Sequence, residues 1–419
     1  MKKVLVLTYS YYPSFHGGVP RIAAFCKYLG RYGWTPTLLA YDSTQDVNAS
    51  STDKKDVCDV YRIKTKKTQK AHALAHKMKV ALKLFKYSFE DIAFISFEKE
   101  LYKTARRLCK EQKFDAILAS SLPQCVHRVA AKLGKEFGIP WVADHRDLVG
   151  QDKETKQKWD IIKKIDRKRV VFRDSKYDKK AARVVTVSQG LADLIYKRAK
   201  RTAVVIPNGY DEDDFKGECS NIPNNKMRIV YTGSLFGDRN IELLFDGLVL
   251  ASQKSEAFAK NTSMAFFGSC CTRVDALLFE KKYESIKQII ENNGSVSHER
   301  SIKEICSADI LYLISHPAKG IATGKIYEYL AAKKTILSAP GDGDITDEII
   351  KQTSSGYVAK NAEELSEKLL LLHSEWIRKG FISTKIKLDE VVKYNRKTQT
   401  EKLAEILEEV SCKRKYDNK

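Results

Sequence analysis

The chain lacks any run of about 18 consecutive apolar residues, the length that crosses a membrane as a helix. A membrane-spanning protein is therefore not expected. The first segment, MKKVLVLTYSYYP, has a basic start but only a short apolar run and no small-residue cleavage site. It predicts a first buried strand and not a signal peptide.

Cysteine is present but lacks the spacing of a metal site. The nine cysteines include no Cys-x-x-Cys pair, the usual signature of structural zinc. Cys270 and Cys271 are adjacent and are expected in the core or at an edge. We therefore expect reduced cytosolic thiols and no disulfide bond.

A complete phosphate-binding loop of the ATPase type is also missing. That loop needs Gly, four residues, and then Gly-Lys-Ser/Thr. Here only three residues separate Gly320 from Gly324, and Ile326 stands where the Mg²⁺-binding hydroxyl belongs. An ATPase is thereby disfavoured. A glycine-containing loop, Lys325 and a helix N-terminus remain, and together they could face an anion.

What the sequence has in excess is positive charge, with 74 Lys and Arg against 53 Asp and Glu and a formal net charge of +21. Such a charge attracts nucleic acid or an acidic lipid surface, although a Lys-rich genome would also produce it. Two stretches, Arg62 to Lys86 and Gln151 to Arg183, are rich in basic residues and also carry apolar ones. In and just after the first stretch these are Leu74, Met78, Leu82, Phe85 and Phe89. In the second they are Trp159, Ile162 and Ile165. These apolar residues either pack on a sheet or form a face that contacts acidic headgroups.

Short apolar runs alternate with longer helix-like stretches, which is typical of βαβ units around parallel sheets. The expected strands are 4–7, 37–40, 116–119, 141–143, 184–187 and 204–206 in the first half, and 229–231, 265–267, 310–314 and 335–337 in the second. A loop at Pro207-Asn208-Gly209 separates the halves. The pattern predicts an α/β protein with two Rossmann-like, doubly wound domains and a ligand cleft between them, at the carboxyl ends of both sheets.

The first expected strand is followed by a glycine pair, Gly17-Gly18. Glycine lets backbone N–H groups approach a ligand closely, and a helix that begins near Pro20 would direct its positive end to the same place. Most glycine pairs are simple turns, but the position directly after a strand favours a ligand site.

Two further loops in the second half carry charged residues. In the first, Gly233 ends a strand, Ser234 offers a hydroxyl, and Arg239 precedes a helix expected at 241–248. Its guanidinium suits a diphosphate, or it pairs with the neighbouring aspartate. In the second, Lys325 and Glu328 share one helical face. Either they form a surface ion pair, or Lys325 binds a phosphate and Glu328 accepts hydrogen bonds from vicinal hydroxyls.

The segments VIPNGYDEDDF, IVYTGSLFGDRN and GKIYEYLAAKKTIL, at these spacings, resemble the GT-B-fold glycosyltransferases of family 4, notably those that build bacterial surface polysaccharides. The resemblance extends from the Gly17-Gly18 loop to the last helix. It implies an acceptor-side, membrane-facing domain over 1–207, a nucleotide-sugar donor domain over 208–390, and a C-terminal helix and tail over 391–419 that pack back on the first domain.

The resemblance also implies roles for individual residues. Glu328 would bind the nucleotide ribose, Arg239 and Lys325 would hold the diphosphate, and Gly18 would approach it from the other domain. The full implied donor-binding set is Gly17, Gly18, Gly233, Ser234, Arg239, His316, Thr323, Gly324, Lys325 and Glu328. The candidate catalytic residues are Asp144, His145, Arg146 and Asp147, where the family often has a His-Asp pair and Arg146 takes the histidine position.

This sequence departs from the family at two other points. The first of the family's paired glutamates, eight positions before Glu328, is here Gly320. The usual Arg and Lys of the second-domain loop appear as Ser234 and Arg239. Two Asp-x-Asp segments, at Asp211–Asp213 and Asp342–Asp344, are expected to be turns and not metal ligands.

The expected function is transfer of a sugar, with retention and without a metal or cofactor, from a nucleotide-diphosphate donor, UDP more than GDP. The acceptor would be a lipid-linked saccharide or glycan of a capsule, O-antigen or lipopolysaccharide. The protein would be cytoplasmic and peripheral on the inner face of the cell membrane, with other polysaccharide-synthesis enzymes as further partners.

Two alternatives stay open. A GT-B nucleotide-sugar epimerase would share the cleft without needing a basic lipid-facing surface. A nucleic-acid-binding protein would explain the charge, but it would not explain the strand–glycine–helix patterns, and no motif for RNA or DNA is present. A nucleic-acid partner is therefore not expected.

Overall fold

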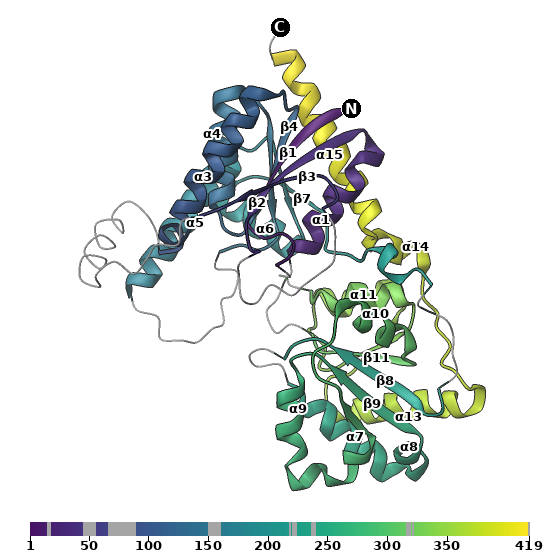
Figure 1. Cartoon of the computed structure of the whole chain (residues 1–419). Helices are drawn as coiled ribbons and strands as arrows, with labels where there is room; N and C mark the ends of the chain where they lie inside the picture. The colour runs from purple at the N-terminus through teal and green to yellow at the C-terminus, as the bar shows by residue number, and fades with distance from the viewer. Residues whose placement is uncertain are drawn as a thin grey trace. The chain divides into compact units, whose positions relative to one another are not determined.

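The computed structural model describes residues 1–14, 18–44, 56–65, 89–149, 161–217, 219, 224–235, 240–315, 320 and 322–417, without the side chains of 89–93, 161–167 and 413–417. The chain divides into two compact units (Figure 1). The first unit comprises Met1–Asn208 and Arg396–Lys419, and the second unit comprises Gly209–Asn395.

The first unit is built on a sheet of seven parallel strands in the order β3-β2-β1-β4-β5-β6-β7. The strands are β1 (Lys2–Leu7), β2 (Trp34–Tyr41), β3 (Asp59–Ile63), β4 (Ala116–Ser121), β5 (Trp141–His145), β6 (Arg183–Thr186) and β7 (Ala203–Val205). Strand order reverses between β1 and β4, which is the place where open parallel sheets form a crevice at the carboxyl ends of their strands.

Helices cover both faces of this sheet. They are α1 (Val19–Tyr28), the 3-10 turn η1 (Leu29–Tyr32), α3 (Phe89–Glu111), α4 (Cys125–Phe137), α5 (Ile161–Lys180), α6 (Gln189–Ala199) and α15 (Arg396–Asp417). On one face, α1 and α15 bury Ile22, Leu403 and Leu407 against the strands. On the other, α3, α4 and α6 form a second apolar layer. The predicted return of the C-terminal helix to the first domain is confirmed, because α15 packs against α1.

The second unit contains six parallel strands in the order β10-β9-β8-β11-β12-β13. They are β8 (Met227–Thr232), β9 (Thr262–Phe267), β10 (Ile290–Asn292), β11 (Ile310–Leu313), β12 (Thr335–Ser338) and β13 (Gly356–Val358). The switch point lies between β8 and β11.

Two apolar layers cover this second sheet as well. The α-helices are α7 (Glu242–Lys254), α8 (Glu256–Lys260), α9 (Cys271–Leu278), α10 (His298–Ser307), α11 (Lys325–Ala332), α12 (Ile345–Thr353), α13 (Ala362–Lys379) and α14 (Leu388–Val391). The 3-10 segments are η2 (Glu212–Phe215), η3 (Lys281–Ile289) and η4 (Val392–Tyr394). The prediction of two Rossmann-like α/β domains is thus confirmed.

Three edge strands and one disulfide bond were not expected from the sequence. Strands β3, β10 and β13 were not predicted, because they are short and only partly buried and so lack an apolar run. The expectation of no disulfide is wrong, since Cys219 and Cys306 are joined. They lie 87 residues apart, and their spacing along the chain gives no sign that the fold brings them together.

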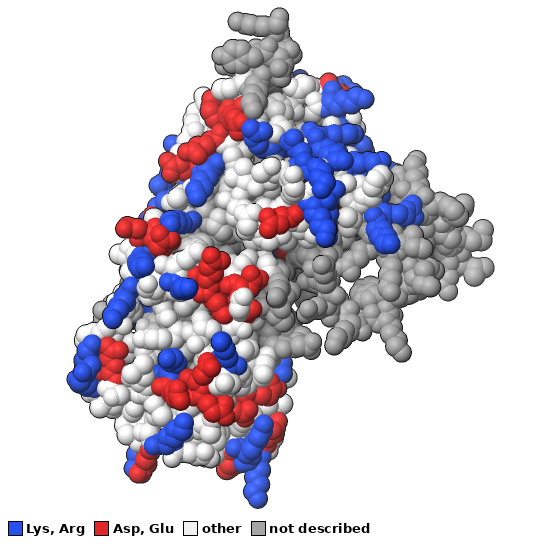
Figure 2. Space-filling model, turned by 180° about the vertical axis from the view of Figure 1, so that it is seen from behind, with Lys and Arg blue, Asp and Glu red and all other residues white. Residues whose placement is uncertain are grey.

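The excess of positive over negative charge lies entirely in the first unit. That unit has 50 Lys and Arg against 26 Asp and Glu, a net of +24, whereas the second has 24 against 27, a net of −3. Figure 2 shows Lys and Arg gathered on one face of the first unit, while both signs are mixed on the second. Of the apolar residues expected in the two basic stretches, Leu74, Met78, Leu82, Phe85 and Trp159 lie outside the described residues. In the part of the chain that the structure describes, no helix is both long and apolar enough to span a membrane.

The packing of α15 on the first unit leads to a prediction about stability. Leu407 is fully buried in the layer shared with α1, so Leu407→Ala should lower the free energy of unfolding of this unit by about 2–5 kcal/mol. Urea denaturation would measure the change. Glu405→Ala, at an exposed position of the same helix, is the matched control. Equal stability of the two variants would show that α15 is not part of the core.

Candidate functional site

A buried ion pair lies at the carboxyl end of β5 in the first unit. Nη2 of Arg21, in the first turn of α1, is 2.8 Å from Oδ1 of Asp144, and the Arg21 Nε also faces the carboxylate. The Ser120 hydroxyl donates to Oδ2 at 2.8 Å. Both charged side chains are almost completely buried. Burial alone would raise the pKa of Asp144, but the Arg21 guanidinium outweighs it and holds that pKa below its usual value.

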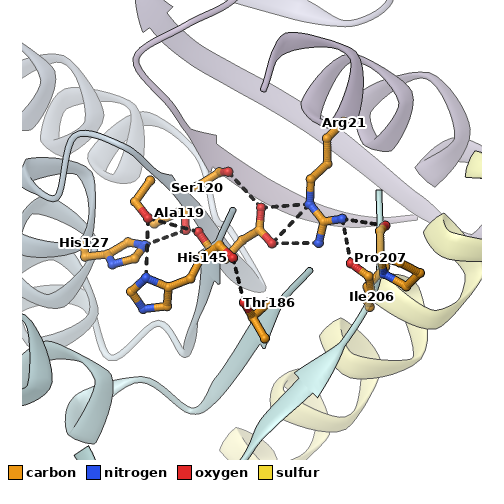
Figure 3. A network of polar contacts seen from close by, with 10 residues as sticks. Arg21, Ala119, Ser120, His127, His145, Thr186, Ile206 and Pro207 are labelled. Atoms are coloured by element: carbon orange, nitrogen blue, oxygen red, sulfur yellow. Dashed lines mark hydrogen bonds and ion pairs between the residues drawn. The ribbon is translucent and has the colours of Figure 1, made fainter. Parts of the chain in front are cut away.

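Arg21 also joins this strand end to the last strand of the sheet. Its Nη1 donates to the carbonyl oxygens of Ile206 at 2.8 Å and Pro207 at 3.0 Å (Figure 3). All three guanidinium nitrogens therefore donate to the protein itself. The arrangement gives Arg21 and Asp144 a positioning role: they hold α1, β5 and the segment after β7 together.

A second buried cluster surrounds His145, the last residue of β5. Its Nε2–H donates to Oδ1 of Asp178 on α5 at 2.7 Å. The edge of the His127 ring approaches it, with ring centroids 4.6 Å apart, and the His127 Nε2–H donates to the Ala119 carbonyl at 3.0 Å. Burial alone would lower the pKa of His145, but the Asp178 carboxylate more than offsets this and raises it. Burial lowers the pKa of His127 to about 3, so this ring is neutral.

His127, His145 and Asp178 are also the one group in the described residues with three ligand atoms close enough for a metal ion, within 4.8 Å of one another. Their hydrogen bonds argue for a different state. The His145 nitrogen nearest Asp178 is used in the ion pair, and one His127 nitrogen is used by a carbonyl. Structural zinc takes four ligands, and only three are offered here. We interpret the cluster as a hydrogen-bonded support for β5.

The next two residues, Arg146 and Asp147, are accessible, with side chains 25% and 32% exposed. They pair at 2.6 Å. The Arg146 guanidinium lies directly over Gly18, at the N-terminus of α1, where an added Cβ would be 2.6 Å from Nη1. A side chain at this position would therefore displace the guanidinium. Of the four predicted catalytic residues, these two can meet a ligand, whereas Asp144 and His145 are enclosed. Gly17 lies outside the described residues.

In the second unit, the predicted donor-binding residues gather at the carboxyl ends of β8 and β11. Helix α11 begins at Lys325, directly after Gly324 and Thr323, and no side chain caps it. Nζ of Lys325 is 2.7 Å from Oε2 of Glu328, and both side chains are partly exposed. The Lys325 side chain passes Gly233, whose φ of +144° is a conformation that favours glycine.

Hydrogen bonds hold these loops in place. The Tyr329 hydroxyl, on α11, accepts the backbone N–H of Thr232 at the end of β8, at 3.1 Å. Ser269 donates to the predicted ligand Ser234 at 2.7 Å. The first turn of α11 is thus fixed against the loop that follows β8, which places the accessible Lys325–Glu328 pair beside Gly233.

Two predicted donor-binding residues, Arg239 and His316, lie outside the described residues. Gly320, which takes the place of the family's first glutamate, donates its N–H to Oδ2 of Asp344 at 2.5 Å. A carboxylate from the β12–α12 loop therefore contacts the backbone of Gly320. Asp342 accepts three backbone N–H groups at the start of α12, which is a turn role.

Sequence patterns alone did not single out Arg21, His127, Asp178 or Asp344. Arg21 had one usable signal, since it lies in the first turn of the helix after the glycine pair. No sequence pattern indicates the role of Asp178, because it is 33 residues from His145 and lies among the basic residues of α5.

No protein-family model matches the chain, and no curated protein matches it in sequence. Solved structures do resemble it. A sucrose-phosphate synthase from Thermosynechococcus elongatus is similar with a TM-score of 0.66 and 14% identity, covering 98% of this chain and 99% of that one. HepE from Anabaena, in complex with UDP-glucose, is similar with a TM-score of 0.64 and 14% identity, covering 98% of this chain and 100% of that one. WaaG, a glycosyltransferase involved in lipopolysaccharide biosynthesis, is similar with a TM-score of 0.57 and 15% identity, covering 96% of this chain and 99% of that one.

The same architecture also occurs in an enzyme of another class. A UDP-GlcNAc 2-epimerase from Methanocaldococcus jannaschii is similar with a TM-score of 0.55 and 10% identity, covering 97% of this chain and 99% of that one. At such identities the likeness shows the fold alone. The chain has the GT-B fold over almost its whole length.

The His145–Asp178 pair makes the stability of the first unit depend on pH. Because the folded pKa of His145 is raised above its ordinary 6.5, its contribution is fully present below that pH and is lost as the pH rises through the folded value. The free energy of unfolding should therefore fall as the pH rises above about 6.5, and Asp178→Asn should flatten that slope. Asp193→Asn, at an exposed position on α6, is the control. An unchanged slope in Asp178→Asn would contradict the assignment.

Proposed function

We propose that this protein is a glycosyltransferase that takes a sugar from a uridine-diphosphate donor bound in the second unit. The observation that carries the proposal is the placement of Lys325 and Glu328 in the uncapped first turn of α11, beside Gly233. The sequence motifs of family 4 enzymes and the likeness to HepE with UDP-glucose over 98% of the chain support it.

The chemistry of these groups suits a nucleoside diphosphate. The positive end of the α11 helix dipole and the Lys325 ammonium together neutralise phosphate charge. Glu328 then loses Lys325 as its main partner and accepts hydrogen bonds from the two ribose hydroxyls. Arg239 adds a second cation in the proposal. The Lys325–Glu328 ion pair is partly exposed, so separating it costs little.

In the first unit we assign the acceptor and the reacting centre. Arg146 and Asp147 are the accessible pair at the carboxyl end of β5, and Gly18 leaves room for the guanidinium. Arg146 would hold an anionic group of the donor or acceptor, and Asp147 would orient it. Asp144 and His145 act behind them as positioning residues, because both are fully buried and satisfied by the protein.

We further propose an acceptor carried at an acidic membrane surface on the cytoplasmic side, as in the assembly of a surface polysaccharide. The net charge of +24 on the first unit supports it. On the neighbouring helices α5 and α6, Phe172 and Tyr196 are 65% and 55% exposed. Lysines lie against both rings, Lys176 over Phe172 and Lys200 over Tyr196. Exposed aromatic rings among lysines suit the interface of an anionic bilayer.

A nucleotide-sugar epimerase is the second candidate, favoured by the likeness to the archaeal UDP-GlcNAc 2-epimerase. The two activities differ in what they need. An epimerase changes the configuration of a sugar without any acceptor, whereas a transferase needs an acceptor to form a new glycosidic bond. Proton NMR of UDP-GlcNAc incubated with the protein alone separates them, since only an epimerase would produce a second nucleotide sugar.

The donor site predicts the behaviour of one substitution. Glu328→Ala should weaken binding of UDP by roughly ten- to a hundredfold, because a hydrogen bond to a charged group contributes about 1.5–3 kcal/mol. Calorimetric titration of UDP would measure the loss. Glu348→Ala, an exposed residue of α12 in the same unit, is the control. Wild-type affinity in Glu328→Ala would refute the ribose assignment, and no UDP binding by the wild type would refute the proposed donor.

The proposed membrane face predicts binding that depends on lipid charge. Each Lys near an anionic surface contributes about 1 kcal/mol to binding. Lys176→Glu, Lys179→Glu and Lys180→Glu combined should therefore lower the affinity of the protein for phosphatidylserine vesicles at least about tenfold. Vesicle sedimentation at low salt would measure this. A triple variant of exposed second-unit lysines, Lys254→Glu, Lys281→Glu and Lys351→Glu, changes the charge equally. Equal release by both triple variants would show that net charge matters and that the α5 face does not.

A further inference from the structure

Two thiols of the first unit lie in contact on one face of its sheet. Cys26 is in the last turn of α1 and is 3% exposed. Cys58 directly precedes β3 and is partly exposed. Neither is in a disulfide bond, and the two side chains form a hydrogen bond with each other. The proposed sugar transfer uses neither of them.

The side-chain pattern of β3 explains why Cys58 reaches α1. Tyr61 and Ile63 pack in the apolar layer that α3 and α4 cover. Cys58 and Val60 pack against the layer on the other face, which α1 and α15 cover and which contains Cys26. Successive side chains of a strand point to opposite faces, so the register of β3 directs Cys58 toward the layer of Cys26.

An ion pair holds the short segment that carries Cys58. Nη2 of Arg62, on β3, is 2.9 Å from Oδ1 and 3.1 Å from Oδ2 of Asp56. On the other side of Cys58, Asp59 begins the parallel pairing of β3 with β2, opposite Thr37. Cys58 is therefore fixed from both directions along the chain, and its contact with Cys26 follows from the fold of this edge of the sheet.

We propose that Cys26 and Cys58 are a site of reversible oxidation, at which hydrogen peroxide joins them in a disulfide bond. The Cys58 thiolate attacks one peroxide oxygen and the O–O bond breaks. Cys58 becomes a sulfenic acid, and the other oxygen leaves as hydroxide, which takes up the thiol proton to give water. The Cys26 sulfur then attacks the Cys58 sulfur, the S–O bond breaks, and the Cys26 proton leaves with that oxygen as a second water. Each sulfur loses one electron, and peroxide is reduced to water.

The surroundings of the two thiols assign the order of these steps. The hydrogen bond to Cys58 and burial raise the pKa of Cys26, so Cys26 keeps its proton and acts second. The buried Tyr11 belongs to the same apolar layer and lies near both thiols. Among the described residues its hydroxyl has no hydrogen-bond partner. This donor is available to the oxygen that peroxide adds to Cys58, which favours the sulfenic acid there.

Other thiols of the chain provide internal comparisons. Cys270 and Cys271 also share a hydrogen bond, but they are buried neighbours in sequence. Consecutive Cα atoms are about 3.8 Å apart, which is shorter than the roughly 4.4–6.8 Å of ordinary disulfides. Cys109, on α3, is partly exposed, and burial raises the pKa of its thiol to about 11. These thiols should therefore react with peroxide more slowly than Cys58.

Peroxide treatment of the full chain, followed by alkylation and peptide mass mapping, tests the proposal. A cross-linked peptide pair that has lost two hydrogens should join Cys26 and Cys58, and it should form at least about tenfold faster than Cys109 is oxidised. In Cys26→Ala, Cys58 should stop at the sulfenic acid, which dimedone traps. Cys125→Ala, which removes a buried thiol of α4, is the matched control and should keep the cross-link.

Glutathione should restore both thiols, because two of its molecules supply the hydrogens and leave joined as a disulfide. Cys26 and Cys58 that stay free while Cys109 is oxidised, or a Cys58 joined to any other cysteine, would overturn the proposal. The wild-type map alone decides this, even where Cys26→Ala does not fold. No nucleotide sugar or acceptor is added, so the result is independent of the proposed function.

Discussion

The buried ion pair between Arg21 and Asp144 fixes the groups around it at the carboxyl edge of the first sheet. Neither charge can be removed alone, because the other would stay buried without a partner. Through the same guanidinium, α1 is held to β5 and to the carbonyls that follow β7. The N-terminus of α1, where Gly18 lies, is therefore held beside the end of β5 that Arg146 follows.

Charge and chemistry are divided between the two units. The second unit is nearly neutral, and in the proposed donor site Lys325 and Arg239 would act locally on one ligand. The first unit carries the whole excess of positive charge, which acts over a distance of about a Debye length and is screened by salt. An enzyme that takes a soluble nucleotide sugar and a membrane-held acceptor needs these two kinds of electrostatics in different places.

Much of the fold follows from the sequence because strands and helices leave local patterns. Lys325 and Glu328, expected on one helical face, both lie on α11, and each predicted strand corresponds to an observed one. Partners far apart in the chain leave no such pattern. Arg21 and Asp144 are 123 residues apart, and Cys219 and Cys306 are 87 apart. Asp344 was placed in a turn, and its contact with Gly320 depends on the spacing of two neighbouring strands. The roles of Glu328 and Arg146 stay predictions, since geometry places side chains without showing what they bind.

The central claim is that the second unit binds a uridine-diphosphate sugar at the start of α11. A crystal structure of the full chain with UDP tests it most directly. The account predicts the diphosphate at the N-terminus of α11 beside Lys325 and Gly233, with the ribose hydroxyls on Glu328. A nucleotide bound elsewhere, or a ribose that does not contact Glu328, would contradict it.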